Sequence, residues 1–235
     1  MRSSVTEKEG PRASAQVRSV IEAFPQPQPV GNSGAMQQLV PGIFHWTAVN
    51  PAIGTRVSSY YVESAGAVID PMVPEGGLDA LPGRPERVLL SSGHHLRDSR
   101  RIADRYGIPI RASRQAADHL GAAGTAIEVW GEGEAHPAPS VTALHVGVLC
   151  EDEGALHIDV GDGALVLADA VHHSRDGLAF FSDPLLGDDP ESVKQGLKAA
   201  LSALADALEF DALLLGHGEP LATGGRAALK EFAER

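Results

Sequence analysis

The segment LLSSGHHLRDSRR, Leu89–Arg101, joins an apolar run to an abrupt polar corner. The run RVLLSS has the composition of a buried strand, and two histidines and Asp98 follow at its end. The next residues, DSRRIADRYG, have helical spacing and stop at Gly107. A strand that delivers His and Asp side chains into the turn before a helix places them where α/β proteins bind ligands. This corner therefore bears on both fold and function.

The composition is ordinary for a soluble globular protein, and we expect a small molecule as its substrate or ligand. The 235 residues are 43% hydrophobic and 21% charged, with a formal net charge of −12. No basic stripe favours nucleic acid, and neither an anionic membrane surface nor a bilayer span is expected. Cys150 is the only cysteine, which excludes an intrachain disulfide. The first residues lack a secretory signal, so a cytoplasmic location is expected; the oligomeric state stays open.

The chain divides into a tail and one domain. Residues 1–36 include FPQPQPVGNSG, a linker rich in Pro, Gln and Gly, and we expect them to be disordered. The folded domain is expected over residues 37–235. Strand-like runs fill two blocks, and each block is followed by helical patterns. The clearest helix begins at Asp189-Pro190 and carries Leu197, Leu201 and Leu204 on one face.

Two strand-rich blocks with helices after each predict two stacked sheets with helices outside, a four-layer αββα sandwich of the α/β class. A doubly wound sheet would need strict strand–helix alternation and a glycine-rich first turn, which this chain lacks. Four apolar strands end in a polar residue: Asp70, His94, Asp169 and His217. His and Asp are ligands of zinc, iron and manganese, so these ends predict a metal site.

This order of residues resembles the metallo-β-lactamase superfamily over about residues 37–235. The resemblance implies an αββα sandwich with one or two metal ions between the sheet edges. The family's diagnostic corner is His-x-His-x-Asp-His. Aligned on Asp98, GHHLRDS places His94 at the first histidine, while Leu96 and Ser99 replace the second and third. The family's mid-chain histidine falls in the region of Val148 and Leu149.

The resemblance therefore implies a reduced site. Of the three histidines that hold one metal, only His94 remains, whereas Asp98, Asp169 and His217 of the other position are present. We expect at most one divalent ion: zinc first, with iron or manganese as alternatives, or none if the site is inactive. Asp98 would also orient the attacking water, and Asp70 matches the family's structural aspartate.

Other residues could replace the missing ligands. His95 is an additional histidine beside His94, but consecutive residues of an extended segment point in opposite directions. His172 and His173 could fold back over the site or belong to a solvated loop. Cys150 lies near the missing mid-chain histidine, although a single cysteine in a strand is more often a small apolar residue.

Two functions follow. The first is hydrolysis of a small ester, thioester, amide or phosphoester with one metal ion, and the missing histidines argue against β-lactams as substrates. The second is a non-catalytic relative that binds a small molecule or a protein partner without metal.

Overall fold

The computed structural model describes residues 34–122, 124–130 and 136–235. Of the predicted tail, only residues 34–36 fall within the described part of the chain, so the expectation for residues 1–33 lies outside it. The first strand begins at Gln37. Within the described ranges, no helix combines the length and the apolar character needed to cross a membrane.

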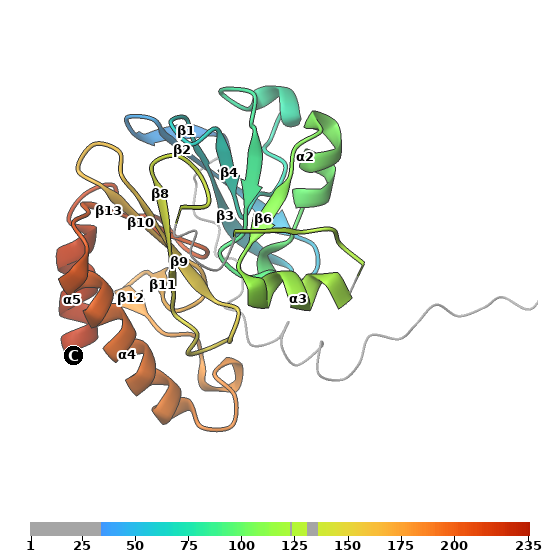
Figure 1. Cartoon of the computed structure of the whole chain (residues 1–235). Helices are drawn as coiled ribbons and strands as arrows, with labels where there is room; N and C mark the ends of the chain where they lie inside the picture. Colours follow the sequence, from blue (N-terminus) through green and yellow to red (C-terminus); the bar gives the residue numbers. More distant parts are fainter. Residues whose placement is uncertain (1–33, 123, 131–135) are drawn as a thin grey trace, which may run out of the picture.

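Two sheets form the centre of the molecule (Figure 1). In the order in which they pair, the strands of the first sheet are β1 (Gln37–Val40), β2 (Ile43–Asn50), β3 (Thr55–Val62), β4 (Ala67–Ile69), β5 (Arg87–Leu89), β6 (Ile110–Ala112) and β7 (Glu128–Val129). Pairing is antiparallel from β1 to β4 and parallel from β4 to β7.

The second sheet is smaller. Its order is β13 (Ala212–Leu215), β10 (Ala164–Leu167), β9 (Gly154–Ile158) and β8 (Val141–His145). Only β10 and β13 pair in parallel, and a turn that includes Gly161-Asp162-Gly163 joins β9 to β10. A separate hairpin of β11 (His172–Ser174) and β12 (Gly177–Ala179) follows β10, so His172 and His173 begin a strand.

Three apolar cores hold the layers together. The core between the sheets joins residues such as Tyr60 and Leu89 of the first sheet to Leu156 and Leu214 of the second. Two further cores pack the helices against the outer sheet faces. The helices α2 (Ser99–Tyr106) and α3 (Arg114–Ala122) cover the first sheet, and α4 (Pro190–Ala207) and α5 (Gly225–Glu234) cover the second (Figure 1). The predicted αββα sandwich is confirmed.

Helix α4 forms as its sequence predicts. Asp189 is the N-cap residue, its Oδ1 accepts a hydrogen bond from the backbone N–H of Ser192, and Pro190 is the first helical residue. Leu197, Leu201 and Leu204 are buried in the outer core against β10 and β13. This packing fixes the two strands whose ends carry Asp169 and His217.

Two helix ends test the glycine signals. Gly107 ends α2 with φ 66°, a left-handed conformation that glycine adopts easily, which confirms that stop. Gly121 follows a helical run in the same way and is also expected to end a helix, but α3 continues to Ala122.

Candidate metal centre

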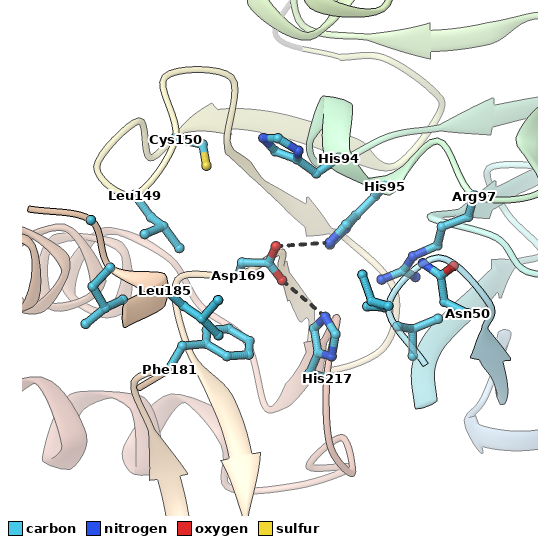
Figure 2. A pocket seen from close by; sticks show the side chains of 14 residues that line it. Asn50, His94, His95, Arg97, Leu149, Cys150, Asp169, Phe181, Leu185 and His217 are labelled. Atoms are coloured by element: carbon cyan, nitrogen blue, oxygen red, sulfur yellow. Dashed lines mark ion pairs between the residues drawn. The ribbon is translucent and has the colours of Figure 1, made fainter. Parts of the chain in front are cut away.

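Three side chains converge where strands of the two sheets end. Leu167 of β10 lies in register with Leu215 of β13, so Asp169 and His217, each two residues further on, emerge side by side. His95 comes from the opposite sheet, in the 3-10 turn Gly93–His95 that follows β5. Figure 2 shows the three side chains pointing toward one another. We call His95, Asp169 and His217 the buried cluster.

The buried cluster has the spacing of shared ligands. One ligand atom from each residue lies within 4.8 Å of the other two. His95 Nε2 is 3.3 Å from Asp169 Oδ2, and His217 Nε2 is 3.5 Å from Asp169 Oδ1. Gly216 permits this approach, because a Cβ there would lie 3.1 Å from His95 Cε1 and 2.9 Å from the Ala168 carbonyl oxygen.

Asp70 sets the orientation of the His95 ring. The Nδ1–H of His95 donates to Asp70 Oδ2 at 2.9 Å, and Asp70 is itself held by the backbone N–H and the hydroxyl of Ser91. All three residues are buried. A carboxylate on Nδ1 directs the other ring nitrogen, Nε2, toward the cluster, as is typical of metal-binding histidines.

The charges of this group are strongly coupled. Burial and the Arg97 charge act to lower the pKa of His95, but the carboxylates of Asp169 and Asp70 outweigh them and raise it to about 9. Burial alone would raise the pKa of Asp169, yet the His95 charge and hydrogen bond hold it well below its usual range. Burial lowers the pKa of His217 to about 4, which keeps that ring neutral near pH 7. As it stands, the cluster holds a proton on His95.

Arg97 brings a buried positive charge beside the cluster. Its Nη1 donates to the carbonyl oxygens of Ser58 and Asp70 at 2.6 and 2.7 Å. Its backbone has φ 42°, which a side chain of this size rarely adopts. Nη2 is buried and has no hydrogen-bond partner among the described residues. The guanidinium and the protonated His95 together balance the carboxylates of Asp70 and Asp169.

The side chain of Glu153 fixes the backbone of Asp169. Its Oε1 accepts the backbone N–H of Asp169 at 2.8 Å. Burial and the neighbouring charge of Asp169 raise the pKa of Glu153 to about 7. This role of Glu153 is not predictable from the sequence, where its one signal is the acidic run EDE before β9.

The buried cluster lies at the edge of a cavity of about 410 Å³. All three of its residues line that cavity, which has an apolar side formed by Leu149, Phe181, Leu185 and Leu186. The Phe181 ring packs edge-on against His217, with centroids 5.4 Å apart. The volume suits a small organic molecule.

A second group of possible ligands borders the same cavity. One ligand atom each of His94, Cys150 and Asp152 lies within 4.8 Å of the others, and His94 and Cys150 line the cavity. His94 is exposed, whereas Asp152 is buried. We call these three residues the rim cluster. Figure 2 shows His94 and Cys150 together on the side of the cavity away from His217.

The predicted ligands His94, Asp98, Asp169 and His217 do not all come together. Asp169 and His217 do, and the third member of their group is His95 in place of Asp98. Asp98 lies at the start of α2, where its Oδ2 accepts the backbone N–H of Val73 at 2.8 Å. Among the described residues, neither cluster contains Asp98.

The residues at the other positions of the motif alignment have structural contacts. Leu96 packs in the outer core of the first sheet, and Leu149 lines the cavity. His172 stacks near Phe181, with ring centroids 4.7 Å apart, and His173 Nδ1 bonds to the Glu219 carbonyl oxygen at 2.8 Å. In the described part of the chain, neither histidine belongs to a cluster of possible ligands.

The buried cluster fits a divalent ion. Two ligands at ~2.1 Å from a tetrahedral zinc lie about 3.4 Å apart, and the two imidazole nitrogens lie 3.3 and 3.5 Å from oxygens of Asp169. Asp169 Oδ1 is buried and accepts no hydrogen bond from the described residues. Two imidazoles and one carboxylate form a ligand set used by open zinc and iron sites.

Comparison with solved structures identifies known proteins that share this fold. No protein-family model and no curated protein matches the chain. Among solved structures, a metallo-β-lactamase from Erythrobacter litoralis aligns with TM-score 0.62 at 12% identity, covering 85% of this chain and 95% of that one. The DIM-1 metallo-β-lactamase aligns with TM-score 0.61 at 14% identity, covering 85% and 96%.

A flavo di-iron protein from Thermotoga maritima aligns with TM-score 0.58 at 16% identity, covering 84% of this chain and 60% of that one. These identities are too low to transfer a substrate or a ligand set, but the alignments extend over most of the chain. The chain therefore has the fold shared by metallo-β-lactamases and flavo di-iron proteins.

Proposed function

We propose that the protein is a hydrolase with one divalent ion, zinc first, held by His95, Asp169 and His217. The observation that carries the proposal is the convergence of these three side chains, from three separate segments, at the edge of a cavity. Random polar strand ends would not bring their ligand atoms within 4.8 Å of one another.

The residues of the buried cluster and their neighbours would have separate roles in hydrolysis. Asp70 holds His95 in the orientation that presents Nε2, and Glu153 holds the backbone of Asp169. Asp169 takes the role of orienting the attacking water, because the Asp98 carboxylate is engaged by the Val73 backbone. A bound ion would polarise the substrate and lower the pKa of a coordinated water toward ~7.

The lining of the cavity supports a class of substrate. Phe181, Leu185 and Leu186 give the cavity an apolar surface, and the residues of the buried cluster line the same cavity. Figure 2 shows Phe181 beside His217. A small molecule with an apolar part next to an ester, thioester, amide or phosphoester group matches this arrangement. A small substrate also agrees with the net charge of −12, which disfavours nucleic acid.

The test combines metal content with hydrolysis. Purified full-length protein is stripped with a chelator, reloaded with zinc, and assayed on one chromogenic ester, thioester, amide and phosphodiester. We expect zinc-dependent hydrolysis of at least one of them, lost in Asp169→Ala. A protein that takes up zinc at no site, or whose hydrolysis survives Asp169→Ala, contradicts the proposal.

A second candidate is a metal-free binding protein. The observation that favours it is the charge balance, because protonated His95 and Arg97 already neutralise Asp70 and Asp169. This candidate predicts that the purified protein carries no metal and that zinc leaves its melting temperature unchanged. Under the hydrolase proposal, zinc raises the melting temperature, since the ion binds the folded state alone.

A further inference from the structure

We propose that the rim cluster, His94, Cys150 and Asp152, is a second cation site that takes a zinc-class ion independently of the buried cluster. The site goes beyond the proposed function, and its existence does not require hydrolysis. It also departs from the expectation of at most one ion, because that expectation left His94 as the single ligand at its position, whereas Cys150 and Asp152 lie beside it.

Two chain segments build the rim cluster. His94 lies in the turn after β5, and Cys150 and Asp152 lie in the loop between β8 and β9. Asp152 Oδ2 accepts the backbone N–H of Gly93 at 3.0 Å, which ties that loop to the turn. A Cβ at position 93 would lie 2.5 Å from this oxygen, so glycine is what lets the carboxylate come so close.

His119 of α3 supplies a fourth donor nearby. Its Nδ1 is 3.6 Å from Asp152 Oδ2, and its ring packs edge-on against His94 with centroids 5.0 Å apart. His94 and His119 are both exposed, so their rings can turn toward an ion without disturbing a core. A thiolate, a carboxylate and two imidazoles within reach are enough ligands for tetrahedral zinc.

The donor set selects the kind of ion. Thiolate sulfur favours zinc and related soft ions, whereas magnesium and calcium prefer oxygen ligands. Burial and the carboxylates of Glu153 and Asp152 raise the pKa of Cys150 to about 12, so the thiol is protonated without an ion. Binding therefore forms a metal–sulfur bond and releases the thiol proton to the solvent.

Cobalt(II) tests this site by spectroscopy. Full-length protein with Cys150 reduced is titrated with cobalt(II), and near-ultraviolet absorption from thiolate-to-cobalt charge transfer is recorded. We expect this band in the wild type and its complete loss in Cys150→Ser, since Cys150 is the only cysteine. His94→Gln should weaken the cobalt affinity read from the band at least about tenfold. His145→Gln, which changes an exposed histidine outside both clusters, should leave it unchanged.

A second variant separates this inference from the proposed function. His217→Ala removes a residue of the buried cluster and should abolish hydrolysis while the charge-transfer band remains. The proposal is overturned if saturating cobalt(II) produces no such band in the wild type, or if His94→Gln binds cobalt(II) as tightly as His145→Gln. Ion content by elemental analysis should fall by one equivalent in Cys150→Ser, and an unchanged content also overturns it.

Discussion

The two clusters share one cavity but differ in how the chain supports them. The buried cluster lies at the ends of β10 and β13, its charges are already paired, and Asp70 and Glu153 brace it from behind. The rim cluster lies on a turn and a loop, is partly exposed, and its thiol carries a proton. Supporting hydrogen bonds favour a fixed geometry at the buried cluster, whereas partial exposure lets a bound ion at the rim cluster exchange with solvent.

The largest expected effect comes from removing one ligand of the buried cluster. His217→Ala should lower zinc affinity there by at least about 100-fold and abolish hydrolysis, because two ligands remain in place of three. Equilibrium dialysis with zinc measures the affinity. His173→Ala is the matched control, since His173 lies on β11 outside both clusters. Equal zinc affinity in the two variants would remove His217 from the site.

The core under the buried cluster should matter next. Leu201 is fully buried against β10 and β13, so Leu201→Ala should lower the free energy of unfolding by ~2–5 kcal/mol. Urea denaturation measures this. Leu208→Ala, at the half-buried end of α4, should cost less. The cobalt charge-transfer band of the rim cluster should persist in folded Leu201→Ala, since Leu201 packs beneath the other cluster.

Replacing Asp70 should affect metal binding at the buried cluster and not at the rim cluster. Asp70→Asn removes the carboxylate that orients His95, so zinc affinity at the buried cluster should fall about 10–100-fold. The rim cluster should keep its cobalt affinity. Asp159→Asn, an exposed acid-to-amide change, serves as the control in the same dialysis measurement. An equal loss at both clusters would mean that Asp70 maintains the fold and not one ring.

Zinc affinity at the buried cluster should depend on pH. An ion at the buried cluster must displace the proton of His95, whose pKa is raised to about 9. Below that pH, zinc affinity should rise about tenfold per pH unit, equivalent to ~1.4 kcal/mol. Calorimetry in buffers of different ionisation enthalpy counts the released protons. Binding without proton release between pH 6 and 8 would contradict the charge state assigned to His95.

The smallest expected effect is at Asp98. Because its carboxylate accepts a backbone N–H, Asp98→Ala should cost about 1 kcal/mol of unfolding free energy. Zinc affinity should change less than about threefold, within the range of an indirect effect. A drop of tenfold or more in dialysis would restore the role that motif alignment assigned to Asp98.

The fold and two of the three residues of the buried cluster were predictable from the sequence for a clear reason. Apolar runs that end in Asp169 and His217 are strands in parallel register, so position along the chain translates directly into position in space. At the corner after β5, position along the chain does not predict which side chain is buried. The 3-10 turn Gly93–His95 rotates successive side chains, burying His95 and exposing His94, which reverses the motif alignment.

The rim cluster could not be predicted in the same way. It depends on a loop contact between Asp152 and Gly93, 59 residues apart, and no periodic pattern encodes such a contact. Arg97 is a similar case, because its left-handed backbone turns a side chain that the sequence places at a helix start toward β3 and β4.

The most direct test of the account is the position of zinc in a crystal. Crystals of the full-length protein are soaked in zinc, and anomalous diffraction is measured at the zinc absorption edge. We predict a peak with His95 Nε2, His217 Nε2 and an oxygen of Asp169 at ~2.0–2.2 Å. A zinc ion bound by Asp98, or no zinc between His95, Asp169 and His217 at saturating concentration, would contradict the central claim.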